Sequence, residues 1–275
     1  MALCRRELDA RGLARSPEAE LFVSHLSGVP RSRLFLEAGR DVGDPAEALA
    51  AMVRRRASGE PIQYILGAWE FYGREFLLSR DTLIPRPETE GLAERAIASL
   101  RSARGGGLAL DVGTGCGTIA VTLAAEVPRA RVVAVDVSAG ALAVAAGNAR
   151  RLGVADRVVF VRADAYSALK RGKRFDVVVS NPPYVSEGEW EMLPREVRDF
   201  EPPGALLAGP DGLSVIRRLV AGAADYLLPG GVLLCEIGET QGEAVRRLPS
   251  GLLSFEGVAR DLAGRDRVAR WARNG

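Results

Sequence analysis

The chain has 275 residues, of which 47% are hydrophobic and 26% charged, so it can bury the core of one large or two modest globular domains. Its 37 basic and 35 acidic residues give a formal net charge of +2, which disfavours a function based on a strongly basic surface. The chain has no apolar run near the roughly 20 residues that span a bilayer, and the opening MALCRRELDA lacks the apolar stretch of a signal peptide.

The cysteines and the single histidine exclude further classes. Cys4, Cys116 and Cys235 lie far apart, with neither metal-ligand spacing nor the pattern of a disulfide framework. His25 stands alone, which disfavours both a zinc site and a histidine-dependent hydrolase. We therefore expect a cytoplasmic protein without a metal, with a monomer as the default state.

The first part of the chain, residues 1–66, is expected to form a small helical domain. Ser16-Pro17-Glu18 is typical of a helix start, with a cap followed by proline at the first helical position. Asp44-Pro45-Ala46-Glu47 has the form of a capping box, and the helix that it opens should end before Gly59-Glu60-Pro61.

The next segment, residues 67–84, is predicted to be a β-hairpin linker, because residues 69–78 are rich in aromatic side chains around a central glycine. Residues 85–275 are expected to form a second, larger domain. Two prolines in Ile84-Pro85-Arg86-Pro87-Glu88 break regular structure before a helix that runs through Leu92 and Leu100.

From residue 108 onward, short apolar runs rich in β-branched residues alternate with helical stretches. This alternation predicts an α/β domain whose parallel sheet is covered by helices on both faces. The predicted strands are Leu108–Val112, Val132–Val135, Val158–Val161, Phe175–Val179 and Gly231–Glu236, with Ser254–Val258 and Arg267–Trp271 as closing strands. The predicted helices are Ile119–Ala125, Ala139–Leu152, Leu213–Leu228 and Thr240–Leu248.

A glycine-rich loop follows the first of these strands. It reads Asp111-Val112-Gly113-Thr114-Gly115-Cys116-Gly117, and glycines there let the backbone approach a ligand closely. The spacing of a dinucleotide loop requires Gly-x-Gly-x-x-Gly, and Thr118 breaks it. The tighter spacing resembles the first motif of Rossmann-like methyltransferases that use S-adenosylmethionine, although a structural turn is an open alternative for the loop alone.

Two acidic residues at later strand ends favour the interpretation of this loop as part of a cofactor site. Asp136 ends the second strand, where a carboxylate accepts both ribose hydroxyls of a nucleoside, and Asp164-Ala165 follow the third. In the methyltransferase pattern Asp164 and Ala165 hold the adenine, although an aspartate at a strand end is often only a helix cap. Open α/β sheets bind ligands at the carboxyl ends of their strands, where all these residues should lie.

The most informative feature is Asn181-Pro182-Pro183-Tyr184 at the end of the fourth strand. A planar NH2 group is a poor nucleophile, because its lone pair is delocalised. The Asn181 side-chain oxygen and the Pro182 carbonyl can accept hydrogen bonds from its two N–H groups. The nitrogen lone pair is then directed at a methyl sulfonium. Pro183 restricts the Pro182 backbone, and Tyr184 offers a flat face for stacking. Neither a histidine nor a metal is needed.

At this point the sequence resembles the HemK-type (PrmC) glutamine N5-methyltransferases that modify peptide chain release factors. The resemblance covers nearly the whole chain. Besides the glycine loop and Asn-Pro-Pro-Tyr, it rests on Gly59-Glu60-Pro61-Ile62-Gln63-Tyr64, Leu83 to Glu90 (LIPRPETE), Phe200-Glu201-Pro202, Glu236-Ile237-Gly238 and Asp261 to Arg267 (DLAGRDR).

The resemblance implies a class I S-adenosylmethionine-dependent methyltransferase fold, a mostly parallel seven-stranded sheet with a small helical N-terminal domain. It also implies methyl transfer to the amide nitrogen of the glutamine in a Gly-Gly-Gln loop, which modulates translation termination. By position, Asp111 and Gly113 to Gly117 (with Thr114, Gly115 and Cys116) would bind the methionine part of the cofactor, Asp136 the ribose, and Asp164 and Ala165 the adenine. Asn181 would also bind the cofactor. With Pro182, Pro183 and Tyr184 it would bind the glutamine amide, and Asn181, Pro182 and Tyr184 would be the catalytic residues. The N-terminal domain would dock the release factor.

Two other substrates remain open at this stage. A sibling glutamine methyltransferase that acts on a ribosomal protein would share the same site chemistry. A nucleic-acid amine methyltransferase also uses an Asn/Asp-Pro-Pro-aromatic motif, but it generally needs a basic groove. The runs Arg54-Arg55-Arg56 and Lys170-Arg171-Gly172-Lys173-Arg174 are more typical of solvated helix ends, so nucleic acid is not expected as a partner. A non-catalytic cofactor-binding module is disfavoured by the intact Asn-Pro-Pro-Tyr.

Overall fold

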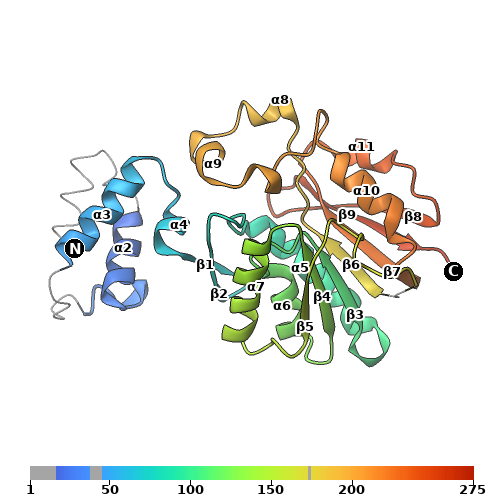
Figure 1. Ribbon diagram of the computed structural model, residues 1–275, viewed down its shortest axis with the longest axis horizontal. Coiled ribbons are helices and arrows are strands. Elements are labelled where there is room, and N and C mark those ends of the chain that lie inside the picture. Colours follow the sequence, from blue (N-terminus) through green and yellow to red (C-terminus); the bar gives the residue numbers. More distant parts are fainter. Residues whose placement is uncertain (1–16, 38–44, 173–174) are drawn as a thin grey trace. The chain divides into compact units, whose positions relative to one another are not determined.

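The computed structural model of the chain describes residues 17–37, 45–172 and 175–275 (Figure 1). Cys4, the cap residues Ser16 and Asp44, and Lys173-Arg174 lie outside these ranges. The described chain divides into two compact units. The first unit consists of the residues up to Ala68 together with Arg195–Phe200, and the second unit of Trp69–Pro194 and Glu201–Gly275.

The first unit is helical. Its helices are α2 (Glu18–Ser27), the 3-10 turn η1 (Arg31–Arg33), α3 (Ala46–Ala57), α4 (Ile62–Leu66) and α9 (Arg195–Phe200). Phe22 of α2, together with Leu49 and Val53 of α3, is buried in its interior. The sequence-based division assigns α9 to the catalytic domain, whereas the structure groups it with the first unit. Arg56 explains part of this grouping, because its guanidinium bonds both Glu18 and Glu196.

The predicted hairpin is confirmed at the start of the second unit. Strands β1 (Ala68–Phe71) and β2 (Arg74–Leu77) form a two-stranded sheet. Tyr72 and Gly73 connect them, with φ of 52° and 67°. This pair of left-handed residues is the backbone that a tight two-residue hairpin requires. Glu90 Oε1 accepts a hydrogen bond of 2.7 Å from Tyr72 N, which ties the turn to the helix that follows.

The second unit is built on a seven-stranded sheet with the order β5-β4-β3-β6-β7-β9-β8 (Figure 1). The strands β3 to β7 pair in parallel, and β9 runs antiparallel to both β7 and β8, so the predicted mostly parallel sheet is confirmed. The strands are β3 (Leu108–Val112), β4 (Arg131–Asp136), β5 (Val158–Arg162), β6 (Phe175–Ser180), β7 (Leu227–Glu236), β8 (Leu253–Arg260) and β9 (Asp266–Arg273).

Helices cover both faces of this sheet because alternate strand residues point to opposite sides. Ala109 and Val177 belong to a buried cluster with the helices Glu90–Ser102 and Thr118–Glu126, whereas Leu110 and Val178 belong to a second cluster with the helix Ser214–Ala223. The helices of the second unit are η2 (Pro87–Thr89), α5 (Glu90–Ser102), η3 (Arg104–Gly106), α6 (Thr118–Glu126), α7 (Ala139–Arg151), α8 (Glu187–Trp190), η4 (Pro203–Ala205), α10 (Ser214–Ala223) and α11 (Gly242–Arg246).

Two predicted helices are too long. The helix expected over Leu213–Leu228 ends at Ala223, and strand β7 already begins at Leu227. Pairing in the sheet decides this boundary, because Phe175 N donates a hydrogen bond of 2.7 Å to Tyr226 O as the chain enters β7. The helix expected over Thr240–Leu248 is the shorter α11, Gly242–Arg246.

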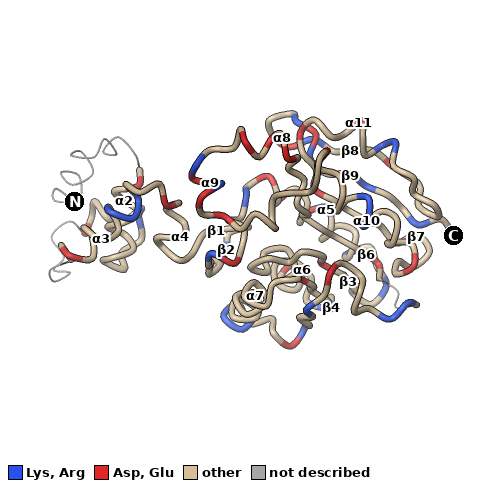
Figure 2. Tube along the Cα trace, turned by 45° about the horizontal axis from the view of Figure 1, so that its top comes forward, with Lys and Arg blue, Asp and Glu red and all other residues tan. Residues whose placement is uncertain are grey.

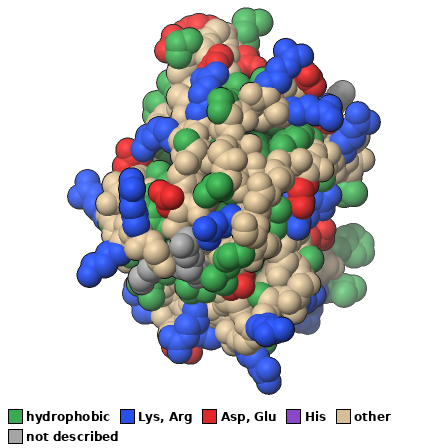
Figure 3. Space-filling view, turned by 90° about the vertical axis from the view of Figure 1, so that its right-hand side faces the viewer, with side chains coloured by type: hydrophobic (Ala, Val, Ile, Leu, Met, Phe, Trp, Pro, Cys, Tyr) green, Lys and Arg blue, Asp and Glu red, His purple; other side chains and the backbone are tan. Residues whose placement is uncertain are grey.

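Charged side chains of both signs are interspersed. Figure 2 shows Lys and Arg near Asp and Glu along much of the trace, and the face in Figure 3 has acidic and apolar side chains between the basic ones. Within the run Arg54-Arg55-Arg56, Arg55 forms two hydrogen bonds of 2.8 Å with Glu60, and Arg56 pairs with Glu18 at 3.0 Å. Two of the three arginines are therefore engaged inside the first unit.

None of the helices in the described ranges has the length and apolar character that a membrane crossing requires.

Candidate active site at the ends of the parallel strands

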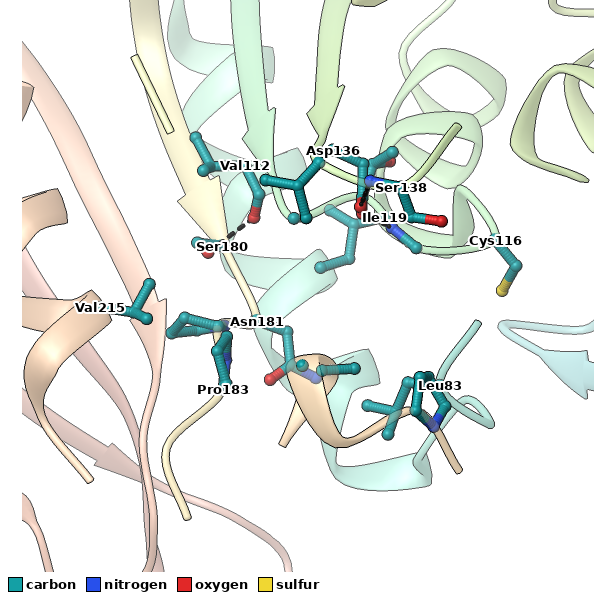
Figure 4. A pocket seen from close by; sticks show the side chains of 18 of the residues that line it. Leu83, Val112, Cys116, Ile119, Asp136, Ser138, Ser180, Asn181, Pro183 and Val215 are labelled. Carbon is teal, nitrogen blue, oxygen red and sulfur yellow. Dashed lines mark hydrogen bonds between the residues drawn. The ribbon is translucent and has the colours of Figure 1, made fainter. Parts of the chain in front are cut away.

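A cavity of about 350 Å³ lies at the carboxyl ends of β3, β4 and β6, which is the size of a small-molecule site (Figure 4). Val112, the last residue of β3, is in register with Val135 on one side and Ser180 on the other, so these three strand ends are neighbours. The cavity is lined by most of the predicted site residues, namely Gly113, Thr114, Gly115, Cys116, Asp136, Asp164, Ala165, Asn181, Pro182 and Pro183.

The glycine loop needs its glycines for backbone reasons. Gly113, Gly115 and Gly117 have φ of 72°, 57° and 87°, in the left-handed region that other residues rarely adopt. Gly117 also allows close packing, because a Cβ on it would lie 3.0 Å from the Cβ of Ala145 in α7. Gly113 N and Thr114 N both donate to Val135 O, which holds the loop against the end of β4.

Three predicted site residues do not line the cavity: Asp111, Gly117 and Tyr184. Asp111 is fully buried and stabilises the glycine loop from the protein interior. Its Oδ2 accepts hydrogen bonds of 2.7 Å from Thr114 Oγ1 and 3.1 Å from Ala120 N. Burial raises the pKa of the Asp111 carboxyl to about 7, against the opposing effect of the Thr114 and Ala120 bonds. Asp111 therefore shapes the loop, and the structure gives it no surface on the cavity.

Asp136 joins the loop to the start of α7. Gly115 N donates to its Oδ2 and Ser138 N to its Oδ1, each at 2.9 Å (Figure 4). A carboxylate has about four acceptor sites, so these two bonds fix its orientation and leave capacity for two hydroxyl groups of a ligand.

Asp164 and Ala165 also line the cavity. Ala165 has φ of 48°, an unfavourable backbone for a residue with a Cβ, and such strain is typical of functional sites. Asp164 Oδ1 pairs with Arg218 of α10 at 2.7 Å, and Arg218 also lines the cavity. No sequence motif marks Arg218, because only the fold brings α10 to this part of the cavity.

Asn181 and Pro183 lie at one side of the cavity, with Asp136 and Ser138 at the other (Figure 4). Asn181 Nδ2 donates a hydrogen bond of 3.1 Å to Thr89 Oγ1, which in turn donates one of 2.7 Å to Glu236 Oε2. Tyr184 supports the same Glu236 carboxylate, because its hydroxyl donates a hydrogen bond of 3.3 Å to Glu236 Oε1. Burial raises the pKa of the Tyr184 hydroxyl, so it remains a donor.

A second carboxylate anchors the proline-rich segment before α5. Glu201 is 3% exposed, and its two oxygens accept from Arg86 Nη2 and from Ile84 N at 3.2 Å. Arg86 lines the cavity and Glu201 does not. The segment Ile84–Glu90 is thus fixed to the second unit by Glu201 at one end and by the Thr89–Glu236 bond at the other.

Asn148 of α7 is a further residue that the sequence analysis missed. It is fully buried, and its Nδ2 donates to Leu77 O at 3.0 Å and to Cys116 O at 2.9 Å, while its Oδ1 accepts from Leu77 N at 2.8 Å. One side chain therefore connects the hairpin to the glycine loop. Its position inside a helix gave no local indication of this role.

Within the described ranges, no group of three or more His, Cys, Asp and Glu side chains is arranged so that it could hold a metal ion.

Two family models match separate segments of the chain, one in its N-terminal part and one in the part that contains the cavity. Residues 94–207 match the family described as "Methyltransferase small domain", and residues 3–67 match "PrmC N-terminal domain". Among solved structures, a methyltransferase from Pyrococcus furiosus has a TM-score of 0.53 at 18% identity, covering 74% of this chain and 91% of that one. At this identity the likeness supports the fold alone.

Curated relatives extend over almost the whole chain. A release factor glutamine methyltransferase of Nitratidesulfovibrio vulgaris is 46% identical over 272 residues, 98% of this chain and 90% of that protein. One of Bordetella pertussis is 43% identical over 274 residues, 98% of each. Together with the methyltransferase sheet and the Asn-Pro-Pro-Tyr cavity, these matches show that the chain belongs to the family of release factor glutamine methyltransferases.

Proposed function

We propose that this chain transfers a methyl group from S-adenosyl-L-methionine to the side-chain amide nitrogen, N5, of the glutamine in the Gly-Gly-Gln motif of class 1 peptide chain release factors. The observation that carries the proposal is the common cavity of Asn181, Pro182 and Asp136, which pairs amide acceptors with a carboxylate suited to a nucleoside. Methylation of this glutamine would modulate translation termination.

The lining of the cavity fits the cofactor chemically. Asp136, held by Gly115 N and Ser138 N, has acceptor sites left for the two ribose hydroxyls. Asp164 and Ala165 would hold the adenine, and the loop from Gly113 to Cys116 would hold the methionine part. When bound, S-adenosyl-L-methionine supplies an electrophilic methyl group on a positively charged sulfur.

The amide of the substrate would be held by the Asn-Pro-Pro-Tyr segment. The Oδ1 of Asn181 and the carbonyl of Pro182 accept hydrogen bonds from the two N–H groups of the amide, so that the nitrogen lone pair is directed at the methyl group. Both acceptors bind the nitrogen more strongly as it pyramidalises and gains positive charge, which stabilises the transition state. The nitrogen loses one proton to water after the new N–C bond has formed. Tyr184 does not line the cavity, so we replace the stacking role expected from the sequence by a supporting one, through the hydrogen bond of its hydroxyl to Glu236.

The free thiols of Cys116 and Cys235 fit a reducing compartment, and we place the reaction in the cytoplasm.

The function is tested by incubating the protein with methyl-labelled cofactor and, separately, release factor, ribosomal protein and duplex DNA. We expect label on the release factor, at the glutamine of Gly-Gly-Gln, as measured by peptide mass spectrometry. Label on the ribosomal protein alone would assign the chain to the sibling activity. Label on DNA alone would overturn the glutamine chemistry altogether.

Docking of the release factor is assigned to residues 1–66. This region carries two adjacent apolar side chains on its surface, Phe35 and Leu36, which are 92% and 80% exposed. Apolar side chains that are exposed side by side could be buried by contact with a protein partner.

Replacing both Phe35 and Leu36 by serine is expected to raise KM for the intact release factor by about 10-fold, which corresponds to a loss of about 1.4 kcal/mol from the two apolar contacts together. The KM for a short Gly-Gly-Gln peptide should not change, because the peptide lacks the rest of the release factor, which is the part assigned to this surface. The exposed Leu262 in the second unit offers a control, and Leu262→Ser should leave both KM values unchanged. Equal KM values for the double variant and the wild type on intact release factor would remove these residues from docking.

A further inference from the structure

The hydrogen bonds around Asn181 lead to one further residue assignment, which rests on the proposed function for its substrate. We propose that Thr89 and Glu236 are positioning residues that decide which end of the Asn181 carboxamide faces the substrate. They act through a one-way chain of hydrogen bonds from the Asn181 NH2 through the Thr89 hydroxyl to the Glu236 carboxylate.

A carboxamide on its own has no fixed direction. Asn181 can turn its oxygen or its NH2 toward the cavity with almost the same shape, but only the oxygen can accept an N–H bond from the substrate amide. An NH2 in the same place would face the two N–H bonds of the substrate and repel them. The enzyme therefore needs a group behind Asn181 that accepts a hydrogen bond and does not donate one.

Thr89 is such a group only because of Glu236. A hydroxyl has one proton, and the ionised Glu236 carboxylate takes it, since a carboxylate can only accept. The bond from Thr89 Oγ1 to Glu236 Oε2 is 2.7 Å long, and both residues are buried, at 3% and 1% exposure. With its proton used in this way, Thr89 Oγ1 can only accept, and it accepts from Asn181 Nδ2 at 3.1 Å. The Oδ1 of Asn181 is then left for the substrate.

Protonation of Glu236 would reverse this direction. A neutral carboxyl can donate to Thr89, which frees the Thr89 proton to bond Asn181 Oδ1 and turns the NH2 toward the cavity. The groups that face Glu236 are Thr89 and Glu88 of η2, Tyr184 after β6 and Arg267 of β9. Burial raises the pKa of Glu236 to about 7, the bonds from Thr89 and Tyr184 and the charge of Arg267 oppose this rise, and Glu88 adds to it.

The pH dependence follows with a definite sign. The carboxylate is the form that directs Asn181 correctly, and it is lost as the pH falls through about 7. We therefore expect kcat to fall on the acid side with a midpoint near that value. In Glu236→Gln this limb should be absent, because the amide does not titrate, and kcat should be low at every pH, because a carboxamide, which can both donate and accept, no longer fixes the direction of the Thr89 hydroxyl.

Thr89→Val provides the sharpest variant, since valine has nearly the same shape and no hydroxyl. We expect kcat to fall by about 10- to 100-fold, because an acceptor for the transition state is no longer held in place, while KM for cofactor is unchanged. Thr89→Ser should retain most of the wild-type turnover. Thr122→Val is the matched control, because Thr122 is equally buried and its Oγ1 has no hydrogen-bond partner among the described residues.

A second readout does not require turnover. The chain contains three asparagines, so protein labelled with 15N-asparagine gives three side-chain NH2 pairs, and the Asn181→Ala spectrum assigns one of them. In the wild type the Asn181 pair should shift with pH around a midpoint near 7, and in Glu236→Gln it should not shift.

The outcomes separate the inference from the proposed function. A wild type that leaves release factor unlabelled overturns the function, and the NMR titration still decides whether Glu236 directs Asn181. If the wild type is active, an Asn181 amide that does not respond to pH, or a Thr89→Val turnover equal to that of Thr122→Val, overturns the positioning role.

Discussion

Asn181→Ala is expected to lower kcat for methylation of the release factor by about 10²- to 10³-fold, the loss found when one oriented transition-state contact is removed. The side-chain oxygen of Asn181 is one of two acceptors assigned to the substrate amide, and it binds most strongly when the nitrogen gains positive charge. Affinity for S-adenosylhomocysteine should survive in large part, because Asp136 and the glycine loop keep their own hydrogen bonds. Single-turnover kinetics and calorimetry measure the two quantities.

Asn274→Ala is the matched control for this prediction. Asn274 is exposed near the end of the chain, where its Oδ1 accepts a bond from Ser254, and its loss should leave kcat unchanged. Wild-type turnover in Asn181→Ala would refute the role of the Asn181 oxygen. A loss of cofactor affinity as large as the loss of kcat would mean that Asn181 acts on the cofactor and not on the amide.

Asn148→Leu is expected to give the largest loss of stability, about 3 to 6 kcal/mol in the free energy of unfolding. The substitution leaves the buried Cys116 O and the partly buried Leu77 N and Leu77 O without their partner. A buried polar group left unpaired costs about 1–3 kcal/mol, and a partly buried one costs less. Because Cys116 lies in the glycine loop, cofactor affinity should fall as well. Urea unfolding and calorimetry with S-adenosylhomocysteine measure these effects.

The neighbouring Gly147→Ala controls for disturbance of helix α7. A Cβ on Gly147 would meet no atom within 4 Å, and alanine has a higher helix propensity than glycine. The free energy of unfolding of this variant should therefore rise by about 0.5–1 kcal/mol. A stability of Asn148→Leu equal to that of the wild type would show that the three hydrogen bonds contribute nothing.

The parts of the site that sequence analysis can predict are those encoded in one short stretch each. The glycine loop, Asp136 and Asn181 each follow a predicted strand, and parallel strands bring their carboxyl ends to one edge, so the cavity could be expected. The seven-stranded sheet could likewise be predicted. Helix ends were less predictable, because the stretch from Leu213 to Leu228 contains both a helix end and a strand start.

The supporting contacts could not be predicted because they join distant parts of the chain. Thr89 and Glu236 are 147 residues apart in sequence, and Asn148 and Leu77 are 71 apart. Both Thr89 and Glu236 lie in segments that support the family resemblance, yet no local pattern assigns a hydrogen-bond partner to either. Asp111 shows the converse, since its place in the loop motif suggested contact with the cofactor, whereas its side chain points into the protein interior.

The membership of α9 in the first unit has a consequence for synthesis on the ribosome. The chain leaves this unit after Ala68, returns to it for Arg195–Phe200 and leaves again, so the unit is not continuous in sequence. Although domains commonly fold in the order in which they are made, this N-terminal unit lacks one helix until the strands β3 to β6 of the second unit have been translated. A fragment that stops at Ala68 would accordingly lack the partner that Glu196 provides for Arg56, and any exchange of this unit between relatives must include both segments.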